Sequence, residues 1–169
     1  MGYNQGTVEN CLVIDVTVGG NGDHGAVVGV NDQGTVTNSY YRNCTVGSES
    51  NLSNPHIVTA GDYVTASIED YSAGIEYDGT LYAPVDAIVS LNLGNSAPAG
   101  ILFDHYIASA GTLTGTENPY SLTMPAEDVT INATLKVPYI DADGNQQTCT
   151  DFTIIESSEN NVSLGTSGQ

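Results

Sequence analysis

The apolar residues of this chain fall in short runs that polar turn residues separate. Residues 63–69 (YVTASIE) and 129–135 (VTINATL) alternate apolar and polar side chains, as strands with one buried face do. Residues 87–93 and 101–107 are more continuously apolar, and the turn-rich segment 92–100 between them predicts a hairpin connection. Abundant Thr, Asn, Ser and Gly favour strands and tight turns over helices. The pattern therefore predicts an all-β fold.

Turn signals mark the ends of the last predicted strands. Pro125 lies in a turn just before the last alternating segment, where its missing N–H group removes no hydrogen bond from a sheet. Strand-like segments flank residues 141–145 (DADGN), and the Asp-Gly pair in this stretch predicts a β-hairpin. Residues 157–169 are polar and rich in Gly and Ser, which predicts either a flexible linker or part of another module.

An internal repeat opens the chain: NQGTVENC at residues 4–11 returns as DQGTVTNS at residues 32–39, 28 positions later. A period in this range, with short β runs and Asn/Gly turns, indicates a solenoid of stacked coils. Asparagine amides at matching positions can bond to one another along such a stack. Stacking would place these residues over one another: Val8 over Val36, and Asn10 over Asn38.

The solenoid would be short. Fewer than two full coils are present, and each coil buries its apolar face only against its neighbours. The first coil should therefore expose an unpaired strand edge around residues 7–18. Such an edge favours either fraying of the N-terminus or edge-mediated self-association of this fragment.

The repeat has a recognisable form. Residues 25–40 read GAVVGVNDQGTVTNSY, and residues 2–12 fit half a copy of the same pattern. This pattern resembles the GLUG motif of bacterial surface proteins, roughly G-hydrophobic-V-G-x-N-x-G-T-I-x-N-C/S-Y. The resemblance implies a short right-handed β-helix (solenoid) segment over about residues 2–46, within a large exported protein.

A second pattern follows in the middle of the chain. Residues 112–135 contain a TLTGTENPY turn that leads into SLTMPAEDVTINAT. Together with the strand-like runs before it, the segment 77–135 resembles a bacterial repeat domain related to the internalin-type B repeats. That family often has a Trp near the segment 101–107, where this chain reads ILFDHYI. The resemblance implies a small β-grasp-like or β-sandwich-like module, used as a spacer or binder on bacterial surfaces.

Polar, turn-rich residues 47–61 separate the two resemblances, so the chain divides into modules. A β-helix repeat segment is expected over residues 1–50, a connector with a first strand over 51–76, and the repeat module over 77–136. Residues 137–169 would begin a further module with a β-hairpin and end in a flexible tail.

Charge narrows the classes of partner. Two basic residues, Arg42 and Lys136, face twenty acidic ones, which gives a formal net charge of −18. This charge repels nucleic acid and anionic membrane surfaces. No apolar run reaches the length of a membrane-spanning helix. We therefore expect no nucleic-acid partner and no membrane insertion, and the resemblances imply an extracellular or cell-surface location.

The chain has no set of metal ligands with a recognised spacing. Residues 19–23 (GGNGD) are close to the calcium-binding G-G-x-G-x-D repeat, but the Asp comes one place early and the motif occurs once. Residues 141–145 begin like an EF-hand loop, but Gln146 and Phe152 stand where that loop needs Gly and Glu. We therefore expect no metal and no cofactor.

The three cysteines, Cys11, Cys44 and Cys149, form no CxxC pair. An odd and sparse set of this kind indicates neither a disulfide framework nor a zinc site. In the repeat alignment Cys11 matches Ser39 and Cys44 matches Val16, so the two repeats do not share a cysteine position. All three thiols are expected to be unpaired.

No catalytic set is apparent, and no catalytic residue is assigned. Acidic pairs such as Glu127-Asp128 are neighbours that point to opposite faces of a strand, which indicates solvated charge. Nucleophile-elbow, phosphate-loop and dinucleotide motifs do not occur in the sequence. Ten tyrosines instead suggest a sugar-stacking platform, with Tyr40 and Tyr41 as candidate ligand-binding residues.

The sequence thus predicts a non-catalytic structural or adhesive module of a bacterial secreted or cell-surface protein. The alternative is an accessory carbohydrate-binding region of a secreted glycan-degrading enzyme. In either case the partner would be a surface ligand, either a glycan or a host or bacterial protein.

Overall fold

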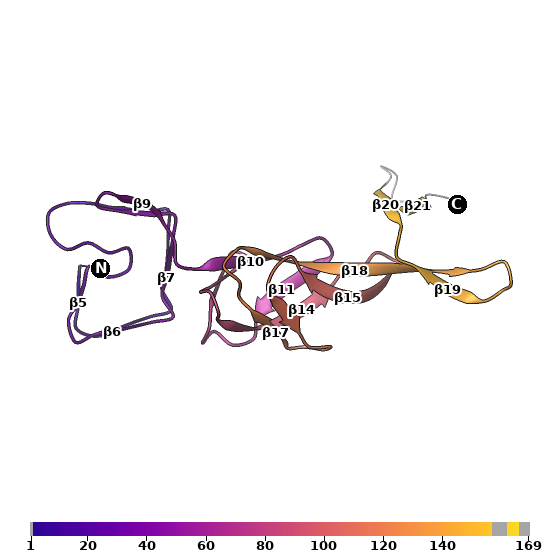
Figure 1. The fold of residues 1–169 in the computed structure, drawn as a ribbon, viewed down its shortest axis with the longest axis horizontal. Coiled ribbons are helices and arrows are strands. Elements are labelled where there is room, and N and C mark those ends of the chain that lie inside the picture. The colour runs from indigo at the N-terminus through magenta and orange to yellow at the C-terminus, as the bar shows by residue number, and fades with distance from the viewer. Residues whose placement is uncertain (1, 157–161, 166–169) are drawn as a thin grey trace.

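A computed structural model describes residues 2–156 and 162–165 of the chain. Every regular element in these residues is a β-strand, which confirms the all-β class. No helix in the described part of the chain has the length and apolar character needed to cross a bilayer. Most of the strands form two structural parts that follow one another along the long axis of the molecule, and the last two strands (residues 153–156 and 162–165) form a separate two-stranded sheet (Figure 1).

The first part consists of the two copies of the N-terminal repeat, residues 2–46, which we call the paired repeats. Each strand of the first copy pairs in parallel with its counterpart in the second, and Val8 lies opposite Val36 as the alignment predicts. Figure 1 shows the paired copies following the same angular outline at one end of the molecule. The strand pairs are β1 (Tyr3–Asn4) with β5 (Val30–Asn31), β2 (Thr7–Glu9) with β6 (Thr35–Thr37), β3 (Leu12–Ile14) with β7 (Tyr40–Arg42), and β4 (Thr17–Val18) with β8 (Cys44–Val46).

Asparagines fix the register of the paired repeats. The Asn38 side-chain Nδ2 donates to Oδ1 of Asn10 over 2.6 Å, so the predicted amide contact between these two positions is present. Both residues have positive φ, 54° at Asn10 and 43° at Asn38, a conformation that Asn adopts more readily than most residues. In a second amide contact, Nδ2 of Asn4 donates to Oδ1 of Asn31. The Asn4 side chain is buried, whereas Asn10 is exposed.

The second part is a pair of sheets, which we call the two-sheet module (residues 56–140). The six-stranded sheet has the order β12 (Ile75–Tyr77), β13 (Thr80–Ala83), β10 (His56–Ala60), β18 (Val129–Ile140) and β15 (Leu102–Ala108), and β19 (Gln146–Cys149) also pairs with β18. The four-stranded sheet has the order β11 (Val64–Ile68), β14 (Ile88–Asn95), β17 (Tyr120–Thr123) and β16 (Thr112–Thr114).

Both sheets contribute to one apolar core. In β18 the side chains of Val129, Ile131 and Leu135 are buried, as the alternating pattern predicts. The four-stranded sheet supplies Leu122 and its neighbours from the opposite side. The core residues are Val58, Val64, Ile68, Leu81, Ala83, Val89, Leu91, Leu93, Leu122, Met124, Val129 and Ile131.

The connection over residues 92–100 is not a hairpin, so that prediction is wrong. The two strands that it joins, β14 and β15, belong to different sheets, and the chain crosses from one sheet to the other between them. The two apolar runs predict strands, but they do not reveal which partner each strand has, and only β14 is buried on one face, since β15 exposes Leu102 and Ile107.

Two predicted module boundaries and part of the expected tail differ from the structure. Residues 51–76, expected as a connector with a first strand, supply β10, β11 and the beginning of β12 to the two sheets. The boundary at 136 lies inside β18, which continues to Ile140 and forms the predicted hairpin with β19. In the expected flexible tail, β21 (Val162–Gly165) pairs with β20 (Thr153–Glu156). The prediction for 157–161 and 166–169 lies outside the described residues.

Candidate functional site

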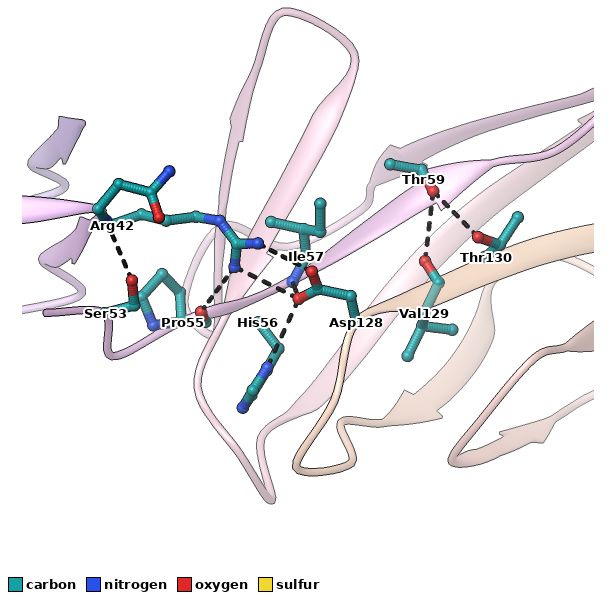
Figure 2. Close-up of polar contacts among 10 residues, drawn as sticks. Arg42, Ser53, Pro55, His56, Ile57, Thr59, Asp128, Val129 and Thr130 are labelled. Carbon is teal, nitrogen blue, oxygen red and sulfur yellow. Dashed lines mark hydrogen bonds and ion pairs between the residues drawn. The ribbon is translucent and has the colours of Figure 1, made fainter. Parts of the chain in front are cut away.

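The most connected polar site joins the paired repeats to the two-sheet module. Arg42, the last residue of β7, forms an ion pair with Asp128, which lies just before β18 (Figure 2). The guanidinium donates through Nη2 to Oδ2 over 2.8 Å and through Nη1 to Oδ1 over 3.3 Å. Such a two-pronged contact fixes orientation as well as distance, since both groups are planar.

Asp128 also holds the beginning of β10. Its Oδ1 accepts the backbone N–H of Ile57 over 3.1 Å and lies 3.5 Å from Nδ1 of His56. Arg42 Nη1 in turn donates to the carbonyl of Pro55 over 3.3 Å. One carboxylate therefore ties together the repeats, β10 and the beginning of β18 (Figure 2).

The protonation of Asp128 follows from these contacts. Partial burial raises the pKa of its carboxyl, but the hydrogen bond from Arg42 and the one from the Ile57 backbone outweigh burial and hold the pKa below its ordinary value of 3.8. Because the pKa is lowered, the ionised form and its contacts are retained at neutral pH and are lost only as the pH falls through that lowered value.

A second set of contacts covers the outer side of the second repeat. β9 (Glu49–Leu52) folds back on β8 as an antiparallel strand. Beyond it, Asn54 exchanges two hydrogen bonds with the backbone of Tyr41, and the Ser53 hydroxyl accepts the N–H of Asn43. The chain that leaves the repeats therefore covers β7 and β8 of the second copy, whereas β1 to β6 each pair on one side only within the described residues.

The repeats also contact the module away from Arg42. Asn38, whose amide already bonds to Asn10, donates to the carbonyls of Tyr71 over 2.7 Å and Gly74 over 3.3 Å. The asparagine ladder therefore ends on the loop before β12, so two separate regions of the repeats hold the module.

Asp128 is exposed, as the interpretation of Glu127 and Asp128 as solvated charge predicts, but it is also ion-paired with Arg42, which that interpretation does not include. Its partner Arg42 lies 86 positions away in the sequence, so no local pattern connects the two. The sequence does offer one signal for an ion pair at Arg42: basic residues are scarce, and Arg42 is one of only two in a chain with twenty acidic residues.

The two tyrosines proposed as a ligand platform do not form one. Tyr40 is 6% exposed, and its hydroxyl donates to Oδ1 of Asn38, so the ring is part of the packing of the repeats. Burial also raises the pKa of this hydroxyl. Tyr41 follows directly on the same strand and is half-buried, and it lines a shallow hollow with residues such as His24 and Leu52. Consecutive strand residues face opposite ways, so the pair cannot stack on one ligand.

The loop at residues 141–145 is a hairpin turn. The Asp141 carboxylate accepts the backbone N–H groups of Asp143 and Asn145 and the side-chain amide of Gln147, and these hydrogen bonds lower the pKa of Asp141. No cluster of three or more metal-binding side chains occurs in the part of the chain that the structure describes. All three cysteines have free thiols, and Cys44 is buried.

Comparison with known proteins identified no relative: no family model, no curated protein and no solved structure matches the chain.

Proposed function

We propose that this chain is a non-catalytic, load-bearing spacer in a bacterial secreted or cell-surface protein. The observation that carries this proposal is the parallel pairing of β10 with β18, the first strand of the two-sheet module and the last of its core strands. Val58 lies opposite Val129, and Ala60 lies opposite Ile131. Both strands run along the long axis of the molecule (Figure 1).

Parallel terminal strands have a mechanical consequence. The chain enters β10 at one end of the ladder and leaves β18 at the other, so tension between the two ends loads all the ladder hydrogen bonds together, in shear. If the strands were antiparallel, the same tension would open the bonds one after another. Shear resistance at the entry and exit strands is the property that a spacer under tension needs.

Side chains reinforce the same ladder. The Thr59 hydroxyl bonds to the carbonyl of Val129 over 3.4 Å and lies 3.3 Å from the hydroxyl of Thr130 (Figure 2). Asp128 adds its bond to the Ile57 N–H and its ion pair to Arg42 at the entry end. Tension that arrives through the repeats therefore reaches β18 directly as well as through β10.

The finer features of the proposal rest on the two sequence resemblances. The parallel stacking of two copies in register supports a β-helix of the GLUG type for the repeats. Two sheets around one core support a β-sandwich-like repeat module. A chain with twenty acidic residues and one lysine suits an extracellular or cell-surface protein, as the resemblances imply.

Single-molecule force spectroscopy tests the proposal by comparing two directions of pulling on one fold. The exposed residues Ser48 and Ala142 lie beyond opposite ends of the β10–β18 ladder, whereas Ser48 and Ala126 lie beyond the same end. Attachment through cysteines at Ser48 and Ala142 should give a high unfolding force, because the ladder is sheared. Attachment at Ser48 and Ala126 should give a much lower force, because the ladder is unzipped.

Cys11 and Cys149 are replaced by serine in both proteins, so that only the introduced thiols are coupled. The two proteins have the same fold and differ only in the direction of the load, which makes each the control for the other. Equal unfolding forces in the two geometries would show that the ladder is not a mechanical clamp and would defeat the spacer proposal.

A further inference from the structure

The end of the paired repeats beyond their second copy is covered on only part of its outline. In Figure 1, β5, β6, β7 and β9 lie on successive sides of the angular outline of the repeats. β9 pairs with the outer edge of β8, and Asn54 bonds to the backbone of Tyr41 beside β7. Within the described residues, β5 pairs only with β1 and β6 only with β2, so their outer edges are free. The chain therefore begins a third coil over β7 and β8 and leaves the other half of it empty.

The two segments nearest to this gap are held elsewhere. After Asn54 the chain passes through Pro55 into β10, which pairs with β13 and β18 in the six-stranded sheet. The first copy of the repeat lies on the opposite side of the second copy, where β1 to β4 pair with it. Neither segment can therefore lie over the free edges of β5 and β6.

The hollow that Tyr41 lines opens at the same end. It has a volume of about 410 Å³, and residues of the second copy and of β9 line it, whereas none of residues 2–18 does. Val36 shows the effect of the missing cover: it is 37% exposed, but Val8, its counterpart in the first copy, is 5% exposed. Apolar surface beside free strand edges is typical of a protein–protein contact. The other apolar residues around the hollow include Val28, Val46 and Leu52.

The shape of this end is complementary to itself. A half-turn about the diagonal of the coil that passes between β5 and β8 exchanges the side of β5 with that of β8, and the side of β6 with that of β7. It therefore carries β9 of a second chain over β5 of the first, and the segment 53–54 over β6. The covered half of each chain then fills the open half of the other. Contacts with this two-fold symmetry are the commonest kind between identical chains.

Charge at this end does not oppose such a contact. Residues 2–54 contain only five of the twenty acidic residues, and Glu49 is the only one of these that lines the hollow among the described residues. His24, from the loop before β5, lines it as well, so a weakly basic side chain accompanies the carboxylate. More distant charges are screened at physiological ionic strength. Two copies can therefore approach through this end with little repulsion.

We propose that the half-covered end of the paired repeats binds a second copy of this chain, with β9 of each copy beside β5 of the other. The two copies then share one complete coil, to which each contributes half. Pairing satisfies free backbone groups of β5 and β9, and closing the hollow buries Val36 and Leu52. The contact does not depend on the mechanical role of the two-sheet module, and it joins two spacers at their repeats.

Sedimentation velocity of the whole chain under reducing conditions tests the proposal. Because the shared surface is small, we expect a monomer–dimer equilibrium with a dissociation constant on the order of 10 µM. Val36→Glu places a carboxylate in the hollow of each copy and should weaken the dimer by about tenfold or more. Val16→Glu is the matched control, because Val16 is 39% exposed in the first copy and does not line the hollow. This control should dimerise as the unmodified chain does.

Hydrogen exchange locates the contact in the unmodified chain, whether or not Val36→Glu folds. Amides in residues 30–37 and 49–52 should exchange more slowly as the concentration is raised from about 1 µM to about 200 µM. Exchange in residues 7–18, at the other end of the repeats, should not change with concentration. The proposal is overturned by a chain that stays monomeric at about 200 µM, by a dimer that survives Val36→Glu unchanged, or by protection confined to residues 7–18, which would place the contact at the first copy.

Discussion

Replacing Leu122 with alanine should lower the free energy of unfolding of the two-sheet module by about 2–5 kcal/mol. Leu122 is 0% exposed and lies between Val89 on β14 and Leu113 on β16 in the sheet register. Truncation removes buried methyl groups and leaves a cavity in a core that two sheets hold in place. Urea denaturation followed by tyrosine fluorescence measures the change.

Ile88→Ala is the control for this prediction. Ile88 is 66% exposed on β14, one residue from Val89, so the same type of truncation removes little buried surface there. The control should cost less than about 0.5 kcal/mol. If both variants lost similar stability, Leu122 would not lie in the shared core that the structure describes.

Replacing Gly34 with alanine should separate the two copies of the repeat. A Cβ atom at Gly34 would lie 2.7 Å from Oδ1 of Asn31 and 2.7 Å from the carbonyl of Gly6, and it would also clash with the Asn4 amide. These atoms belong to the contacts that hold β1 and β2 against the second copy. Overpacking of this kind costs about 1–3 kcal/mol. Hydrogen exchange in residues 2–18 should therefore accelerate by roughly 5- to 150-fold.

Gly19→Ala provides the comparison, because no atom lies within 4 Å of a Cβ built at Gly19. Exchange in residues 2–18 should be nearly unchanged in this variant. Exchange at residues 129–135 should be unchanged in both variants, since the module has its own core. Fast exchange throughout residues 2–18 in the unmodified chain would mean that the copies do not stack stably and that Gly34 cannot be tested this way.

Local patterns predicted the elements of this fold well. The alternation in residues 129–135 fixed the buried face of β18, and the Asp-Gly pair in residues 141–145 marked the turn before β19. The repeat offset predicted the strand register of the paired copies, including Val8 opposite Val36. Each of these features depends on residues that are close in sequence or on a direct repetition of sequence.

Features that depend on distant partners were not predictable from the same patterns. The apolar runs in β14 and β15 were recognised as strands, but nothing local assigns them to different sheets. The partner of Asp128 is 86 residues away. Tyr40 was chosen for its ring, but in the structure its burial makes it part of the packing of the repeats. The bulge at Asp104 shows no signal in a single sequence.

The mechanical account also requires that the repeats and the module move as one body. Two independent connections support this: the Arg42–Asp128 ion pair, and the bonds from Asn38 to the loop before β12. Asp128→Asn removes the charge while keeping the shape of the side chain, and Glu127→Gln removes the same charge from its exposed neighbour.

Residual dipolar couplings of backbone amides in the unmodified chain test this central claim most directly. A single alignment tensor should fit the couplings of residues 2–46 and of residues 56–140. In the Asp128→Asn variant, the tensor fitted to residues 2–46 should differ in magnitude from the tensor fitted to residues 56–140. In the Glu127→Gln variant, the two fitted tensors should remain equal. Two tensors of clearly different magnitude in the unmodified chain would contradict the account, because the repeats would then pivot freely and could not pass tension to β18 through Arg42.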